Sequence, residues 1–424
     1  MISDWKRKPL DFRLLNSMSV ILFCHFSVAL LCVNVMYDLF FFGFPLHILN
    51  SIGLIPTRIN HKIATFIINW TTPTVYGIPM VLSGTKVYID NVDVLIEAKE
   101  SNSLLLANHG SRFDWMVGMF VGHLKCLGDK RGRRSRVGFV CEALIQFMPL
   151  VGWYRKIICN DIFVWRSFKK DEPAIKKNIS AFLQAEESRM LFLSPEGVVV
   201  DNVFEKDTKY IHECRSFCIK QGYKPLDYVL TPRYKGTACL LEQVSGGGCL
   251  ISLCLVFVRD GKLLNCKLLS DSRVIPDLYD LNQGISGKPI SIFIHARKLQ
   301  VSDSEIFDPK SVLMAEYEWK DTVIADCEKL LDEGNIEWHS QFTKVEGSIK
   351  EVYINHVLHI LAILLTVKVT GFKIFQFLHL FFGLFCVITM THTIGCFVNS
   401  TSMESVPFET GIKAIFNCRR SGTK

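Results

Sequence analysis

The sequence has no internal repeat, no low-complexity linker and no paired arrangement of its cysteines. Its 15 cysteines are scattered without the spacing of a disulfide framework, and we interpret them as reduced thiols that face the cytosol. His212, Cys214 and Cys218 lie close together, but one cluster without a second pair is weak support for zinc, and we expect no bound metal. The Gly-x-Ser-x-Gly elbow of many serine hydrolases is also absent.

Charge and hydropathy indicate a membrane protein. A formal net charge of +7 favours an anionic partner, such as membrane phosphate groups or a nucleotide-bearing molecule. Nucleic acid is not expected, because no basic and aromatic recognition pattern accompanies the charge. The mean hydropathy of +0.25 is high for a soluble protein, and the apolar residues are concentrated at the two ends of the chain.

The N-terminal region, residues 1–84, is interpreted as a basic segment followed by a membrane anchor. Basic residues precede a long apolar stretch at 18–44 and favour a cytosolic N-terminus. A signal-peptide cleavage site is conceivable at 27–29, but the apolar character continues well beyond it, which favours a retained anchor. Asp38 interrupts the stretch and Pro45 follows it, so both a single span and a hairpin are open.

The C-terminal region holds two more apolar runs. Residues 352–367 are free of Lys, Arg, Asp and Glu, and so are residues 374–398. The second run is long enough to span a membrane and the first is marginal. We interpret residues 346–398 as a membrane hairpin and residues 399–424 as a polar tail.

The region between the anchors, residues 85–345, has the pattern of an α/β domain. Strand-like runs alternate with longer helical patterns and lie at 87–89, 104–107, 137–140, 162–165, 190–193, 250–258 and 290–294. This alternation predicts a mainly parallel sheet covered by helices. Residues 125–136 hold six basic residues and one acid; they form either a solvated loop or a contact with anionic lipid or substrate.

One short segment, residues 107–116, carries candidate catalytic chemistry. A buried strand precedes it and an apolar helix follows, and Ser111 and Asp114 have the spacing of a helix capping box. His109 would then lie at the positive end of the helix, which favours a neutral imidazole. A neutral imidazole beside a carboxylate suits a general base that acts on a hydroxyl. Taken alone, such a segment is more often a capped helix beside an ordinary loop histidine.

Four blocks of the central domain, in order, resemble the glycerolipid acyltransferases that use acyl-CoA to acylate lysophosphatidic acid and related lysophospholipids. They are NHGSRFDW at 108–115, IFVWR at 162–166, LSPEG at 193–197 and VLTPR at 229–233. The segment FVCEAL at 139–144, followed by Pro149, Gly152 and Trp153, also looks similar. The Asp-Trp ending of the first block and PRYKG at 232–236 look most like the animal lysocardiolipin and lysophosphatidic acid acyltransferase branch.

The resemblance implies an acyltransferase of the endoplasmic reticulum or an associated membrane. Its catalytic domain would be cytosolic, and its anchors multi-pass or re-entrant. Acyl-CoA would be the co-substrate, an anionic lysophospholipid the acceptor, and no cofactor is implied. By the same resemblance His109 takes a proton from the acceptor hydroxyl, and Asp114 orients the imidazole.

The other blocks imply acceptor-binding residues. Arg166 would bind the acceptor phosphate, with a structural ion pair as its alternative. Glu196 would bind acceptor hydroxyls or fix Arg166, or else satisfy backbone amides in a turn. Gly197 would allow close approach of a ligand. Pro232 and Arg233 would add a rigid turn and a second cation, although a solvated arginine is an equal alternative.

The chain departs from the family pattern at three positions. Cys141 stands where a lysine is usual, Ser194 where a phenylalanine is usual, and Val198 where a threonine is usual. Because Pro195, Glu196 and Gly197 are intact, these departures bear on substrate preference before activity. Two alternatives stay open: a non-catalytic membrane scaffold that kept the fold, and a hydrolase of acyl-CoA or lipid.

Overall fold

The computed structural model describes residues 12–123, 136–148, 150–183, 189–202, 204–245, 249–299, 308–335 and 340–370. Most of the basic loop predicted at 125–136 lies outside the described residues. The apolar run at 374–398, the polar tail and Pro149 also lie outside them.

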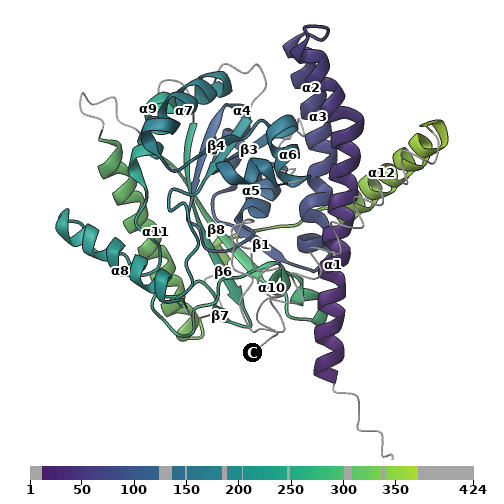
Figure 1. The fold of residues 1–424 in the computed structure, drawn as a ribbon. Coiled ribbons are helices and arrows are strands. Elements are labelled where there is room, and N and C mark those ends of the chain that lie inside the picture. The colour runs from purple at the N-terminus through teal and green to yellow at the C-terminus, as the bar shows by residue number, and fades with distance from the viewer. Residues whose placement is uncertain are drawn as a thin grey trace, which may run out of the picture.

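The described strands form one twisted mixed sheet in the order β4-β3-β5-β2-β6-β8-β1-β9, with β7 paired to β6 (Figure 1). The strands are β1 (Lys86–Ile89), β2 (Ser103–Ala107), β3 (Arg136–Glu142), β4 (Ile162–Val164), β5 (Arg189–Leu193), β6 (Cys249–Arg259), β7 (Lys262–Leu263), β8 (Ser291–Lys298) and β9 (Thr343–Val345). The five strands from β4 to β6 are parallel, and β8 pairs antiparallel with β6. The predicted mainly parallel sheet is confirmed, and each of the seven predicted runs is a strand. Sequence patterns missed β7 and β9, which are too short to show alternation.

Helices surround this sheet. They are α1 (Phe12–Asp38), α2 (Phe44–Ser51), α3 (Thr57–Tyr76), α4 (Val92–Glu100), α5 (Asp114–His123), α6 (Val151–Tyr154), α7 (Phe168–Leu183), α8 (Glu205–Lys220), α9 (Tyr234–Ser245), α10 (Leu278–Asn282), α11 (Pro309–Asp332) and α12 (Ile349–Thr370). Short π-helical or 3₁₀ turns are η1 (Leu39–Gly43), η2 (Gly77–Leu82), η3 (Ala143–Phe147), η4 (Arg155–Cys159) and η5 (Gln283–Ser286).

Both faces of the central strand β2 are buried, which explains its unbroken apolar sequence. Side chains alternate along a strand. Leu105 and Ala107 therefore enter the core that α5 covers, whereas Leu104 and Leu106 enter the core that α7 and α9 cover. The long helix α11 packs across β6 and β8 and forms a third core with them. The first sequence block thus directly follows the carboxyl end of β2, a strand in the middle of the sheet.

The N-terminal apolar stretch is one helical rod followed by a return helix. Helix runs without a break through α1, η1 and α2, because Pro45 lies in the first turn of α2, where proline is tolerated. After a turn, α3 packs back on α1 (Figure 1). Of the two arrangements left open for the stretch at 18–44, the structure shows one continuous helix without an internal turn. Together with the return helix α3, this rod forms what we call the N-terminal hairpin.

Two helices among the described residues are long and apolar enough to cross a membrane, Ser19–Ser51 and Ile349–Val369. The second is longer than the uncharged run at 352–367, because Lys350, Glu351 and Lys368 continue the helix at its ends. It meets the N-terminal hairpin at a buried polar contact, where His359 Nε2 lies 3.8 Å from Asp38 Oδ1. Helix α12 therefore contacts the N-terminal hairpin beside the sheet.

The close packing of α5 on the sheet gives a test of the fold. A Cβ at Gly118 would lie 2.8 Å from Cδ2 of the buried Phe192 ring. We expect Gly118→Ala to lower the free energy of unfolding by about 1–3 kcal/mol, measured by thermal unfolding in detergent. Gly236→Ala is the control, because the nearest atom to its Cβ is 3.9 Å away, and it should unfold at the same or a higher temperature. Equal transitions for wild type and Gly118→Ala would contradict this packing.

Candidate active site

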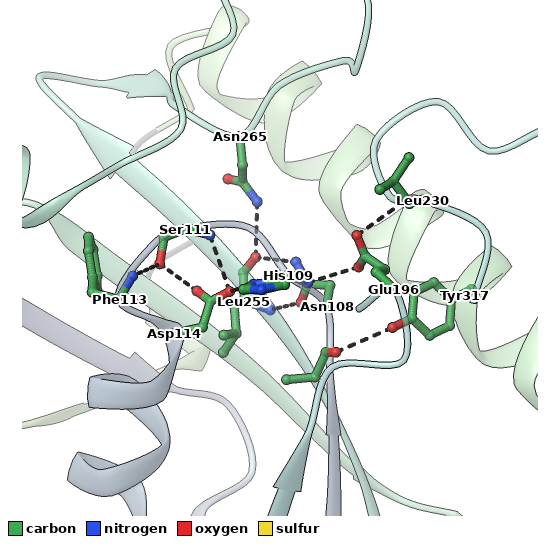
Figure 2. A network of polar contacts seen from close by, with 11 residues as sticks. Asn108, His109, Ser111, Phe113, Asp114, Glu196, Leu230, Leu255, Asn265 and Tyr317 are labelled. Carbon is green, nitrogen blue, oxygen red and sulfur yellow. Dashed lines mark hydrogen bonds and ion pairs between the residues drawn. The ribbon is translucent and has the colours of Figure 1, made fainter. Parts of the chain in front are cut away.

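His109 and Asp114 meet in the loop between β2 and α5. His109 Nδ1 lies 2.8 Å from Asp114 Oδ2, and the imidazole is 29% exposed while the carboxylate is 2% exposed. Ser111 holds the same carboxylate, because its hydroxyl donates to Asp114 Oδ1 at 2.5 Å and its backbone N–H to Oδ2 at 3.2 Å. The contact of Ser111 with Asp114 and the candidate pair of His109 and Asp114 therefore occur together in one turn (Figure 2).

The environment of His109 favours its protonated form. Burial alone disfavours the imidazolium, but the hydrogen bond and negative charge of Asp114, with a further contribution from Glu196, outweigh burial and raise the pKa of His109. Because Nδ1 donates to Asp114 in the neutral ring, Nε2 is left as the basic atom. A histidine with this arrangement can take a proton and be stabilised after doing so.

The strand end that carries His109 is fixed by two buried asparagines. Asn108 continues the β2–β6 pairing with its side chain: its Nδ2 donates to Leu255 O at 3.0 Å, and its Oδ1 accepts from Leu255 N at 2.6 Å. Asn265 donates to the same carbonyl at 3.1 Å. Both side chains are 1% exposed, so unmet hydrogen bonds here would be costly. The chain consequently leaves the sheet at one defined point, immediately before His109.

Glu196 is a positioning residue rather than a ligand group at the surface. Its Oε1 accepts from the backbone N–H of His109 at 2.8 Å, and its Oε2 from that of Leu230 at 3.3 Å (Figure 2). The side chain is 3% exposed, and burial raises the pKa of its carboxyl against these hydrogen bonds. Its carboxylate oxygens thus contact backbone amides, and Arg166 donates instead to Gly197 O. The alternative, a turn residue that satisfies backbone amides, fits the geometry.

Helix α11 supplies two further buried groups behind the first block. Tyr317 donates its hydroxyl to Ala107 O at 3.3 Å, and Lys320 Nζ donates to Leu106 O at 2.8 Å (Figure 2 shows the tyrosine). Both side chains are fully buried, and burial lowers the pKa of Lys320 to about 8. Sequence analysis missed both residues. They lie three positions apart on one helix face, but nothing in the sequence distinguishes this lysine from the solvated ones.

A cavity of about 510 Å³ lies beside this loop and is lined by residues from the other three sequence blocks. Arg166, Gly197, Pro232 and Arg233 all line it, as the sequence predicted for one binding site. His109, Asp114 and Glu196 do not line it; the Pro195–Gly197 turn connects the two places. Pro195 and Gly197 face the cavity, while Glu196 between them holds the backbone of His109.

Arg166 is held in an uncommon backbone conformation with φ of 61°. Asp171 explains it, because its two carboxylate oxygens accept from the N–H groups of Trp165 and Ser167, each at 2.8 Å. The guanidinium donates to Gly197 O at 2.8 Å and forms an ion pair with Glu142 at 2.9 Å, yet it stays 37% exposed. Arg166 thus forms a structural ion pair, which was its alternative role, and its partly exposed guanidinium also places a cation at the cavity.

Arg233 lies on the other side of the same turn. Its backbone N–H donates to Pro195 O at 2.8 Å, and its guanidinium donates to the Tyr210 hydroxyl at 3.4 Å. Gly197 has φ of +71°, and a Cβ there would lie 3.4 Å from the Arg233 side chain. The glycine is therefore favoured by its backbone conformation, while the Arg233 side chain would be in ordinary contact with a Cβ at this position.

Two of the three departures from the family pattern line the cavity. Cys141 and Ser194 both face it, and burial raises the pKa of the Cys141 thiol, so this position carries no charge at neutral pH. His212 is exposed on α8, whereas Cys218 is buried against Thr231. Within the described residues, no group of three or more His, Cys, Asp or Glu side chains is placed to hold a metal ion.

Comparison with known proteins confirms the resemblance seen in the four blocks. Over 297 residues, 69% of this chain and 70% of the relative, the chain is 24% identical to a probable 1-acyl-sn-glycerol-3-phosphate acyltransferase 5 of Arabidopsis thaliana. It is 29% identical over 146 residues to the mouse 1-acyl-sn-glycerol-3-phosphate acyltransferase epsilon, covering 34% of this chain and 37% of that protein. It is 25% identical over 225 residues to zebrafish (Danio rerio) lysocardiolipin acyltransferase 1, covering 52% of each. No family model matches the chain.

The raised pKa of His109 gives a test in the pH dependence of activity. A general base must be neutral, so kcat/KM should fall as pH drops through the His109 pKa, above the value of about 6.5 for a free histidine. Asp114→Asn removes the charge that raises this pKa, and the acid limb should move to lower pH while the plateau rate falls. Asp90→Asn is the control. The Asp90 carboxylate lies 3.0 Å from the His295 ring nitrogen, and this pair is away from the site. An unmoved limb in Asp114→Asn would assign the titration to another group.

Proposed function

We propose that this protein is a membrane-bound acyltransferase that moves a fatty acyl group from acyl-CoA to the free hydroxyl of an anionic lysophospholipid. The observation that carries the proposal is the partly exposed His109 imidazole, hydrogen-bonded through Nδ1 to the buried Asp114. The named relatives, which are glycerolipid acyltransferases, support the reaction class. Lysophosphatidic acid and lysocardiolipin are the first acceptors to test.

In the proposed reaction His109 Nε2 takes the proton of the acceptor hydroxyl as its oxygen attacks the thioester carbon. Asp114 stabilises the imidazolium that forms. The carbon–sulfur bond then breaks, and the imidazolium returns the proton to the departing thiolate of CoA. The products are the diacylated phospholipid and free CoA, and no oxidant, reductant or bound cofactor is needed.

The cavity suits an amphiphilic acceptor. Arg166 and Arg233 flank Gly197 and place two cations at one side, where an anionic head group would bind. The walls include Val140, Ile175, Leu193, Phe217 and Leu240, which suit hydrocarbon. Cys141 is neutral and adds no charge. The Lys and Arg side chains among the described lining residues are Arg166, Arg233 and Lys235, and the two arginines contact the turn at Gly197. We therefore assign head-group recognition to Arg166 and Arg233.

We also propose an endoplasmic reticulum or associated membrane, with the catalytic domain at the cytosolic leaflet. The two apolar helices support membrane attachment. The free thiols among the described cysteines agree with a cytosolic domain.

The activity is tested with His109→Ala in membranes that contain equal amounts of each variant. Labelled oleoyl-CoA is supplied with lysophosphatidic acid, lysophosphatidylinositol, lysophosphatidylglycerol or monolysocardiolipin. Transfer to at least one acceptor is expected in wild type, with a loss of about 10²–10⁴-fold in the variant, because general-base catalysis contributes on this order. His212→Ala, an exposed histidine of α8, is the matched control and should keep wild-type activity.

Three results would contradict the proposal in different ways. Equal transfer by wild type and His109→Ala would remove His109 from the reaction. Release of free fatty acid that does not depend on an acceptor would indicate a hydrolase. No activity of wild type on any acceptor would favour the non-catalytic scaffold.

The assignment of Arg166 is tested by the separate requirements for the two substrates. Arg166→Ala should raise the KM for the acceptor about tenfold or more, since a charge-assisted contact to phosphate contributes about 1.5–3 kcal/mol, and should change the KM for acyl-CoA much less. Arg215→Ala is the control, because Arg215 pairs with Asp227 and does not line the cavity. Equal weakening of both substrates would remove Arg166 from the head-group site.

A further inference from the structure

Large apolar side chains are exposed around the carboxyl ends of β3 and β4. Trp165 is 53% exposed and Phe147 is 58% exposed. We call the full set the rim patch, and its members are Leu144, Phe147, Met148, Trp165 and Phe168. Exposed aromatic and aliphatic groups gathered in one place are uncommon on a soluble surface and indicate an interaction site.

The members of the rim patch belong to one surface. The rings of Phe147 and Trp165 have centroids 6.3 Å apart, which joins η3 to the end of β4. The ion pair between Glu142 and Arg166 holds the same two chain segments together immediately beside these rings. Leu144 and Met148 lie within one helical turn of Phe147.

The rim patch borders the cavity of the proposed active site. Phe168 is a member of the patch and also lines the cavity. Arg166, which lines the cavity as well, directly follows Trp165 in the chain. The cavity therefore opens beside an apolar surface.

The rim patch is continuous with the apolar N-terminal hairpin. The chain passes from η3 into α6 and η4, and these pack between the sheet and the hairpin (Figure 1). Phe44 of α2 contacts Trp153 of α6, with ring centroids 6.2 Å apart. Beyond that contact, Ile48, Ile52 and Leu54 are exposed on α2 and the following turn. Apolar surface thus extends from the cavity to the tip of a candidate membrane helix.

The charges beside the rim patch are mostly basic. Lys156 contacts Gln146 of η3, and Lys169 and Lys170 follow Phe168; all three lysines are exposed. The nearby acids already have partners, because Glu142 pairs with Arg166 and Asp171 binds backbone N–H groups. Aromatic side chains flanked by lysines suit the boundary between lipid tails and anionic head groups.

We propose that the rim patch docks on the surface of the lipid bilayer, so that the cavity opens toward the membrane and takes its acceptor from the lipid layer. The docking itself requires only the surface described above. The entry of the acceptor rests in addition on the proposed acyltransferase function. The amphiphilic lysophospholipid would then reach Arg166 without leaving the bilayer for water.

The docking is tested by photocrosslinking of the full chain reconstituted in vesicles of phosphatidylcholine and phosphatidylglycerol, without substrates. A benzophenone amino acid replaces Trp165 in one variant and Ile219 in another. Ile219 is even more exposed than Trp165, at 65%, but lies on α8, far across the domain from the N-terminal helices (Figure 1). Lipid adducts are expected at the Trp165 position and only background at the Ile219 position. Equal background at both positions, or crosslinks from the Trp165 position to the chain itself, would overturn the proposal.

A kinetic test addresses acceptor entry. Phe147→Ser combined with Trp165→Ser should raise the KM for a long-chain acceptor in vesicles about tenfold, because two apolar anchors are lost. The KM for a short-chain acceptor dissolved as monomers should stay unchanged, since neither residue lines the cavity. Ile219→Ser is the control, and thermal unfolding checks that each variant is folded. Equal effects on both acceptors would overturn entry from the bilayer.

The two proposals fail separately. Lipid adducts at the Trp165 position with no transferase activity on any acceptor would leave the docking surface standing and reject the proposed function. Transferase activity without lipid adducts would support the proposed function and reject the docking surface.

Discussion

The arrangement of the site depends on one buried carboxylate. Glu196 accepts backbone N–H groups from His109 and from Leu230, which belong to the first and fourth sequence blocks, and sits itself in the third. A carboxylate that is 3% exposed must have its lone pairs satisfied, so each of these loops is held at hydrogen-bond distance from the same side chain. The second block joins through Arg166, which donates to the carbonyl of Gly197. Four segments spread over more than a hundred residues of sequence are thereby fixed relative to one turn.

Buried charge of the opposite sign lies near Glu196. Lys320 is fully buried, donates to Leu106 O and contributes a favourable charge to Glu196. Neither group is exposed enough for solvent to screen its charge, and removing one partner of such an arrangement leaves the other uncompensated in a medium of low polarity. The loop of His109 is thus fixed at two points, by Glu196 at the His109 backbone and by α11 at the carbonyls of Leu106 and Ala107. This explains how a loop histidine can keep a defined orientation, which a general base requires.

The sequence predicts the local parts of this site better than its assembly. The pairing of Ser111, His109 and Asp114 spans only a few residues in one strand-to-helix turn, so spacing alone indicates it. Arg166 and Gly197 meet at one cavity because the parallel strands β4 and β5, which precede them, end at the same edge of the sheet. Arg233 follows no strand, and its backbone N–H instead binds Pro195 O. The sequence left open whether Glu196 contacts the acceptor or backbone amides, because a glutamate in a turn looks the same in sequence whether its side chain points to solvent or inward. Tyr317 and Lys320 were missed because their partners are backbone carbonyls more than two hundred residues away.

The same geometry explains why changes in the family pattern need not affect the chemistry. Ser194 and Cys141 face the cavity, whereas the contacts that fix His109 run through the backbone and through Glu196. The third block can therefore change the side chain before Pro195 and alter the shape of the cavity without moving His109. Asp171 binds the backbone on both sides of Arg166 and so sets the direction of the arginine independently of the side chains that line the rest of the cavity. In the proposed reaction, substrate preference and proton transfer would thus depend on different atoms of the same four loops.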